Sequence, residues 1–194
     1  MTTRQIILVD LDGVLADFDG ATETFLKENH PDIAIAPRKN FYFHEDYLDS
    51  AQQVIIKNLH ASQYFFQNLS EIPNAVQGWQ RIIDLGYEPR ICSSPLHSNE
   101  WCKAEKLDWV ERHLGKQARD TAIITSDKEQ ASGIALIDDR PVIKHVDRAV
   151  WQHVVFHQPY NQHIDTPFRL RDWNDKNLAT ILETAAQMYQ QSNT

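Results

Sequence analysis

The chain has 194 residues, 42% of them hydrophobic and 24% charged, which suits one globular domain or one domain with a modest insertion. Its formal net charge of −8 argues against a nucleic-acid polymer as partner, because a phosphate backbone is bound by a stripe of Lys and Arg. A single nucleotide stays compatible, since its phosphate needs only a local positive site.

The first predicted element is the apolar run IILV at residues 6–9. Further short apolar runs follow at residues 89–92 (PRIC), 122–125 (AIIT), 134–137 (IALI) and 154–156 (VVF). Helical patterns separate most of these runs, which is typical of a parallel α/β sheet. We therefore predict a Rossmann-like parallel sheet flanked by helices.

Residues 17–72 depart from this alternation. The segment is longer than one crossover, is rich in aromatic residues (NFYFHEDY and QYFFQN), and has helical apolar spacing. We predict a small, mostly helical cap inserted after the first strand, over the sheet edge where ligands bind in open α/β folds. The core domain would then comprise residues 1–16 and 73–194.

Three later helices are marked by their ends. Pro73 opens one helix and Gly86 ends it, in keeping with the preference for Pro at helix starts and Gly after helix ends. A second helix is expected over residues 98–114, and a third from Asn174. The first of these helices has an apolar stripe, and Trp173 and Leu178 are placed as a hydrophobic staple around the start of the third.

Polar and charged side chains follow four of the predicted strands. They are Asp10 and Asp12 (VDLDG), Ser93 and Ser94 (ICSSP), Lys128 (TSDKEQ), and Asp138 and Asp139 (LIDDRP). Because the carboxyl ends of parallel strands meet at one edge of a sheet, these residues are expected to converge.

The four carboxylates predict a divalent cation, since they cannot all stay ionised close together without one. Mg²⁺ suits best, because it takes one or two carboxylates, keeps waters and shares a substrate phosphate. The serine hydroxyls would donate to phosphate oxygens, and Lys128 would offset the phosphoryl charge. The spacing of the first pair lets Asp10 attack phosphorus, while Asp12 protonates the leaving alcohol and later takes a proton from water.

Other interpretations explain fewer of these features. An EF-hand needs a third acid and a distal glutamate that this spacing lacks. In a response-regulator receiver domain the lysine comes last, whereas Lys128 precedes the final acidic pair. A non-catalytic phosphate- or nucleotide-binding module stays open, although such a protein would have no use for Asp12.

The cysteines and the N-terminus indicate a reducing, cytoplasmic setting. Cys92 and Cys102 do not form a CxxC pair, and nothing indicates a disulfide framework. No apolar run approaches the ~20 residues of a membrane helix. The N-terminal MTTRQ leads directly into the first predicted strand, which leaves no room for a signal peptide. A monomer and a homodimer are both compatible with the sequence.

These motifs resemble those of the haloacid dehalogenase superfamily phosphatases. DLDGV matches the first motif, ICSS the second, Lys128 the third and IDDRP the fourth. Over nearly the whole chain the sequence is similar to the 5′(3′)-deoxyribonucleotidases, through VDLDGVLADF, ICSSPL, DWVERHLG, SDKEQ, LIDDRP and WQHVVFHQPYNQH. The resemblance implies a Mg²⁺-dependent 5′-nucleotidase for deoxyribonucleoside monophosphates, pyrimidine ones first, acting through an aspartyl-phosphate. A phosphatase for other small esters, such as sugar phosphates, is the alternative.

The resemblance also implies roles for single residues. Magnesium would be held by the Asp10 carboxylate, the Asp12 backbone carbonyl and Asp139, with Asp138 supporting. The phosphate would be held by Ser93, Ser94 and Lys128.

The substrate pocket is implied less specifically. Base and sugar contacts would come from Phe18, Phe41, Tyr42 and Phe43, with Arg140 as a lesser candidate. The same aromatic residues are also expected as the insertion's own core. The sequence departs from the animal members of the family at two positions: Ser93 replaces Thr, and His97 stands where they carry a Lys or Arg-like donor near the phosphate.

Overall fold

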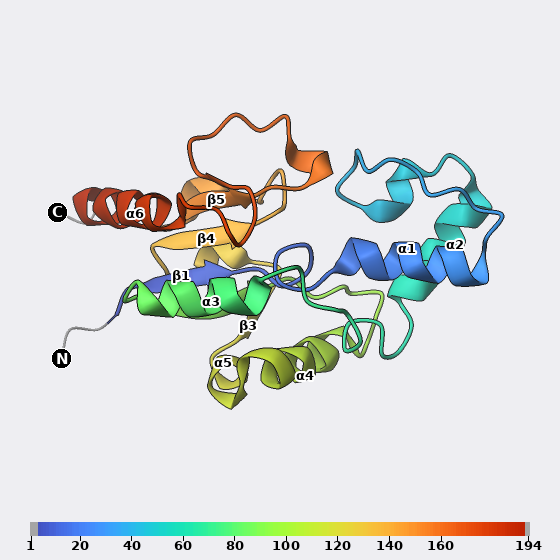
Figure 1. Ribbon diagram of the computed structural model, residues 1–194, viewed down its shortest axis with the longest axis horizontal. Helices are drawn as coiled ribbons and strands as arrows, with labels where there is room; N and C mark the ends of the chain where they lie inside the picture. Colours follow the sequence, from blue (N-terminus) through green and yellow to red (C-terminus); the bar gives the residue numbers. More distant parts are fainter. Residues whose placement is uncertain (1–3, 193–194) are drawn as a thin grey trace.

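Residues 4–192 are described by the computed structural model in Figure 1. Six parallel strands form one sheet in the order β3-β2-β1-β4-β5-β6. The strands are β1 (Ile6–Val9), β2 (Glu88–Ser93), β3 (Ile123–Ile124), β4 (Ala135–Asp138), β5 (Gln152–Phe156) and β6 (Arg169–Leu170). The predicted parallel α/β sheet is confirmed, and β6 is a short edge strand that the apolar pattern did not indicate. Residues 1–3 and 193–194 of the expected core lie outside the described residues.

Six α-helices and four 3-10 helices are found among residues 4–192. The α-helices are α1 (Phe18–Asn29), α2 (Ser50–His60), α3 (Ala75–Asp84), α4 (Cys102–Leu114), α5 (Lys116–Asp120) and α6 (Leu178–Ser192). The 3-10 helices are η1 (Phe43–Asp46), η2 (Lys128–Gln130), η3 (Val146–Arg148) and η4 (Pro159–Asn161). None of these helices is long and apolar enough to cross a membrane.

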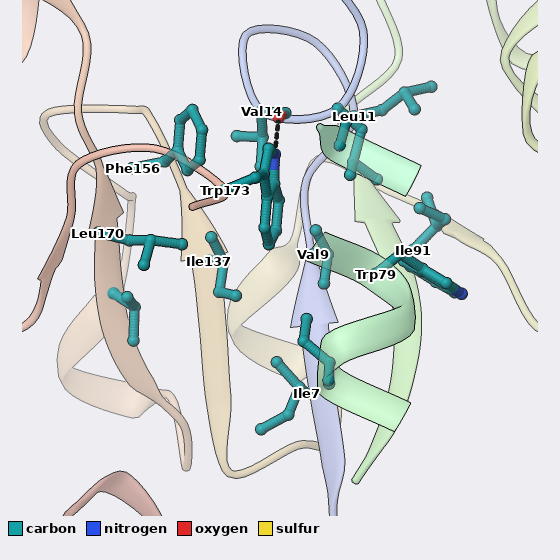
Figure 2. Packing of buried hydrophobic residues seen from close by; sticks show 14 of the residues in the cluster. Ile7, Val9, Leu11, Val14, Trp79, Ile91, Ile137, Phe156, Leu170 and Trp173 are labelled. Carbon is teal, nitrogen blue, oxygen red and sulfur yellow. Dashed lines mark hydrogen bonds between the residues drawn. The ribbon is translucent and has the colours of Figure 1, made fainter. Parts of the chain in front are cut away.

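The sheet separates two apolar layers, because successive strand residues point to opposite faces. In β1, Ile7 and Val9 join the larger cluster, which includes side chains of α3, α4 and α6, while Leu8 joins a smaller cluster on the other face. Figure 2 shows the larger cluster around Trp173, whose Nε1 donates a 2.7 Å hydrogen bond to the Val14 carbonyl. This bond ties the C-terminal part of the chain to the loop after β1.

The segment after β1 leaves the sheet and builds a separate group of helices. α1, η1 and α2 lie beyond the carboxyl ends of the strands, at the right of Figure 1, and have their own apolar cluster. Backbone bonds join the outgoing and returning chain: Asp17 N donates to Ser70 O and Ile72 N donates to Leu15 O, both at 2.8 Å. Within residues 17–72, α1, η1 and α2 form the helical part, and the rest of the segment consists of turns and loops.

Three helices begin later than predicted. α3 begins at Ala75 rather than at Pro73, after a turn in which Asn74 has a left-handed backbone conformation. Before α4 and α6, asparagine and aspartate side chains hold the preceding residues in turns. α4 begins at Cys102 rather than at residue 98, where Asn99 Oδ1 accepts from Trp101 N at 2.9 Å. α6 begins at Leu178 rather than at Asn174. Before it, Asp172 accepts from the N–H of residue 174 at 2.7 Å, and Asp175 from that of residue 177 at 2.9 Å.

Candidate active site

Polar residues follow the central strands at the carboxyl edge of the sheet. Asp10 comes one residue after β1, Ser93 ends β2, and Asp138 ends β4. Because β1 pairs in parallel with both β2 and β4, these three side chains start from adjacent strand ends. The topology brings together residues that are far apart in the sequence.

Lys128, at the start of η2, places a positively charged side chain at this edge of the sheet. Its Nζ lies 2.8 Å from Asp10 Oδ2 and 2.6 Å from Asp138 Oδ2. The side chain is buried, and the Lys128 carbonyl accepts a hydrogen bond from Trp151 Nε1 at 3.1 Å. One ammonium thus compensates two carboxylates whose burial would otherwise be costly.

Asp10, Asp138 and Asp139 form a compact group suited to a hard divalent cation. One oxygen from each lies within 4.8 Å of the others. Asp139 Oδ2 accepts a hydrogen bond from the Tyr160 hydroxyl, but Asp139 Oδ1 is buried and has no hydrogen-bond partner among the described residues. A buried oxygen without a partner is costly, and Mg²⁺ binds oxygen ligands of this kind. The residues present therefore fit such an ion.

Lys106, in α4, is a second buried cation, which the sequence analysis did not identify. Its Nζ lies 2.7 Å from Asp12 Oδ2. The same ammonium donates to Ser93 Oγ at 2.9 Å and to the Ser94 carbonyl at 2.7 Å, and it lies 5.1 Å from the centre of the Phe66 ring. A positive charge is thus held beside Asp12 and both serines of the second motif.

A helical spacing signal could have located Lys106. Cys102, Glu105, Lys106 and Trp109 are spaced as one face of a helix, and all four are buried. A lysine on the buried face of a helix needs a partner, because an isolated buried charge is costly. Reading α4 for its buried face would therefore have singled this residue out.

The neighbouring charges shift the acidity of the carboxylates in different directions. Burial raises the pKa of Asp12 above its ordinary value, and Lys106 offsets this only in part. Burial also opposes ionisation of Asp10, but Lys128 and Lys106 hold its pKa below the ordinary value. Burial and the nearby carboxylates raise the pKa of Asp139 well above its ordinary value. The site can thus supply an ionised carboxylate close to one that keeps its proton more readily.

Gly13 lets the loop after β1 approach these acids closely. Its φ of 73° lies in the left-handed region that favours glycine. A Cβ at this position would overlap Asp139 Oδ2 and come within 3.1 Å of the Tyr160 hydroxyl. The Gly13 carbonyl accepts a 2.7 Å hydrogen bond from Gln158 Nε2, which holds the loop in place.

A cavity of about 430 Å³ extends from the acids toward α1 and α2. Asp12, Ser94 and Asp139 line it at the sheet edge. Its aromatic wall consists of Phe18, Phe41, Tyr42, Phe43, Phe66 and Tyr160, and Arg140, His44, Lys57, Asn58 and His60 add polar groups. The structure thus brings the predicted aromatic residues and Arg140 to the same cavity as the acids.

The aromatic residues of the insertion have two kinds of surroundings. Phe43 is buried in the apolar cluster of the cap helices and also lines the cavity. Phe41 lies between the two parts of the chain: its ring centre is 5.7 Å from that of Tyr160 and 4.4 Å from the Arg140 guanidinium. Core packing and cavity lining are therefore combined in this segment.

His60, in the cavity wall, is a neutral buried histidine. Its Nε2 lies 3.0 Å from Thr22 Oγ1, and the Thr22 hydroxyl donates to the Phe18 carbonyl at 2.9 Å. Because that hydroxyl has one hydrogen, the His60 ring must donate through Nε2–H. Burial, with His44 and Arg38 nearby, lowers the pKa of His60 to about 3.

The other predicted residues do not line the cavity. Asp10, Ser93, Lys128 and Asp138 are not among its lining residues. They are joined to the residues that line it through the contacts described above. His97 is exposed, and its Nε2 lies 3.1 Å from Ser126 Oγ. The residues on either side of it, 96 and 98, line the cavity, so the turn of the loop directs His97 away from the cavity.

Solved structures with low sequence identity share the fold. A haloacid dehalogenase-like family hydrolase from Xanthomonas campestris superposes with a TM-score of 0.51 at 9% identity, over 98% of this chain and 100% of its own. The L-2-haloacid dehalogenase from Xanthobacter autotrophicus gives 0.53 at 10% identity, over 93% and 99%. The fold is thus of the haloacid dehalogenase type. With this fold, and with the family match and the named relatives given next, the protein is in the class of hydrolases that act on phosphoric monoesters.

The family follows from the sequence comparison. Residues 4–187 match the family described as 5′ nucleotidase, deoxy (pyrimidine), cytosolic type C, and the chain belongs to it. A Bordetella bronchiseptica protein provisionally named 5′(3′)-deoxyribonucleotidase is 41% identical over 173 residues, 88% of this chain and 92% of that protein. The human cytosolic-type 5′(3′)-deoxyribonucleotidase is 34% identical over 192 residues, 92% and 93% of the two chains. The family resemblance read from the motifs is confirmed.

Proposed function

We propose that this protein is a Mg²⁺-dependent phosphatase that hydrolyses deoxyribonucleoside monophosphates, with pyrimidine bases preferred. The observation that carries the proposal is that Asp12, Asp139 and the aromatic residues line the same cavity. Its volume of about 430 Å³ is large enough for a small ligand with a flat ring. The names of the related proteins support the substrate class. The likeness to the human cytosolic-type protein supports a cytoplasmic location.

In this proposal two aspartates carry the chemistry. Asp10, whose carboxylate Lys128 keeps ionised, attacks phosphorus and forms an aspartyl-phosphate as the bond from phosphorus to the ester oxygen breaks. Asp12 gives its proton to the departing alcohol. It then accepts a proton from the water that attacks the aspartyl-phosphate, and this step releases inorganic phosphate and restores both residues.

The remaining residues bind and balance charge. Asp10, Asp139 and the Asp12 carbonyl would hold Mg²⁺, with Asp138 supporting, and the ion when bound would offset the negative charge of the phosphoryl group. Ser94 lines the cavity, and Lys106 lies beside it. We assign phosphate binding to Ser93, Ser94, Lys128 and Lys106. Residues 17–72 would act as a cap that excludes water from the reacting groups.

The nucleoside part would lie against the aromatic wall. Phe18 and Phe41 present flat faces on which a base can stack, and a mostly apolar sugar site would disfavour a ribose whose 2′-hydroxyl stays unpaired. Phosphate release from a panel of deoxyribonucleotides, ribonucleotides and sugar phosphates, with Mg²⁺ and with EDTA, tests the proposal. We expect the fastest Mg²⁺-dependent release from pyrimidine deoxyribonucleotides; faster turnover of sugar phosphates would favour the alternative of a general phosphatase.

A further inference from the structure

The chain that returns from the cap to the core is held by side chains of α4 and its preceding turn. We call residues 60–69 the strap. Four side chains bond to its backbone, and three of them donate: Asn99 Nδ2 to His60 O and Ser62 O (both 2.9 Å), Arg112 Nη1 to Gln67 O (3.0 Å), and Trp109 Nε1 to Leu69 O (2.8 Å). The fourth, Glu105, is the acceptor.

Glu105 is a buried carboxylate that pairs with backbone amides instead of a cation. Its Oε2 accepts from Phe66 N at 3.0 Å, and its Oε1 accepts from Tyr64 N. The residue is 4% exposed, and no Lys, Arg or His within residues 4–192 forms an ion pair with it. A buried charge of this kind persists only when its hydrogen bonds are made.

The strap is strained at the point that Glu105 holds. Tyr64 has a φ of 69°, in the left-handed region where a residue with a bulky side chain is a genuine outlier. Such a conformation is kept when surrounding contacts over-determine it, and such residues cluster at functional sites. The hydrogen bonds that two backbone N–H groups donate to the Glu105 carboxylate supply such contacts and hold Tyr64 in this conformation.

The second residue whose amide Glu105 holds, Phe66, reaches the candidate active site. Phe66 is buried, lines the cavity and places its ring 5.1 Å from Lys106 Nζ. Glu105 and Lys106 are adjacent on α4, so one side chain holds the Phe66 backbone while the next pairs with Asp12. The ring thereby lies against the ammonium of Lys106 and forms part of the cavity wall.

We propose that Glu105 is a positioning residue for the reaction: by holding the amides of Tyr64 and Phe66, it keeps the Phe66 ring against Lys106 and fixes the cavity wall. The proposal rests on the proposed function for its kinetic consequences, but its structural consequence can be measured without substrate. Glu105 touches none of the reacting groups and acts through Phe66.

Glu105→Gln tests this with little change of shape. The glutamine has one oxygen for two amides, and its own N–H groups face the second amide. We expect amide exchange of residues 62–67, measured by mass spectrometry, to quicken about tenfold or more, because a hydrogen bond to a charged group is lost. KM for the best nucleotide in the substrate panel is expected to rise about tenfold, with kcat changed less than about threefold. Glu111→Gln, an exposed position on the same helix that pairs with Arg119, is the matched control and should change neither quantity.

A double-mutant cycle of Glu105 and Phe66 distinguishes a residue that positions the Phe66 ring from one that only stabilises the fold. If Glu105 acts through the ring, Glu105→Gln adds no further rise in KM to that of Phe66→Leu. Additive effects on KM, or exchange and KM unchanged in Glu105→Gln, would overturn the proposal. Should Glu105→Gln fail to fold, amide exchange of the unaltered protein by NMR decides: the Tyr64 and Phe66 amides must be protected. Absence of phosphatase activity in the unaltered protein would contradict the proposed function, whereas the measured amide exchange of the strap would still test the role of Glu105 in holding it.

Discussion

Replacing Lys106 by methionine removes the charge beside Asp12 while keeping most of the packing volume. The ammonium has three partners at 2.7 to 2.9 Å, and one of them is the carboxylate of Asp12. Removing one partner of a buried ion pair costs about 3–5 kcal/mol. The Asp12 side chain is 25% exposed, so water screens part of the remaining charge, and we expect the lower end, about 3 kcal/mol.

In Lys106→Met we expect kcat for phosphate release to fall even where the variant stays folded. The variant leaves Asp12 without its cation and the second-motif serines without their shared donor, and loss of one preorganised donor costs about 10²–10³ in kcat. Urea unfolding followed by circular dichroism measures the stability, and phosphate release measures the rate. Lys103→Met, an exposed lysine on the same helix, is the control. A Lys106→Met protein within about 1 kcal/mol of the parent, with unchanged kcat, would refute this account of the ion pair.

Three further predictions concern the cap, the loop after β1 and the cation. His60 has a pKa that falls from 6.5 to about 3 on folding, so it protonates first in the unfolded chain. Its contribution should therefore lower the free energy of unfolding by about 1.4 kcal/mol per pH unit between about pH 6 and pH 3, and His60→Phe should flatten that slope in unfolding titrations. Gly13→Ala, at a φ of 73° with Asp139 in its way, should cost about 1–3 kcal/mol in urea unfolding and weaken Mg²⁺ binding by calorimetry. An unchanged Mg²⁺ affinity in Gly13→Ala would contradict the close approach of Gly13 to Asp139. EDTA should abolish phosphate release without unfolding the chain, and Mg²⁺ should restore it; full activity in EDTA would contradict a metal requirement.

The sheet and its acidic edge could be predicted because both depend on local patterns. Apolar runs separated by helical spacing fix a parallel sheet, and parallel strands place Asp10, Asp138 and Lys128 at one edge whatever the details of packing. The family motifs then identified the fold type. These features are confirmed in the architecture, while the chemical roles of the residues stay predictions.

What escaped the sequence depends on contacts between distant segments. Lys106 becomes a site residue only because α4 packs with its buried face against the loop of Asp12, and Tyr160 only because η4 folds back onto Asp139. The outward turn of His97 depends on the loop after β2. No local pattern determines these contacts, although the buried face of α4 could have pointed to Lys106.

The central claim is that Asp10 and Asp139 share one Mg²⁺ and that Asp10 is the nucleophile. Beryllofluoride, which mimics an aspartyl-phosphate, tests both parts in one crystal structure of the protein with Mg²⁺. We predict the beryllium bonded to an Asp10 carboxylate oxygen and Mg²⁺ bound by Asp10 and Asp139, with no adduct in Asp10→Asn. An adduct on another residue, or a cation that Asp139 does not contact, would contradict the account.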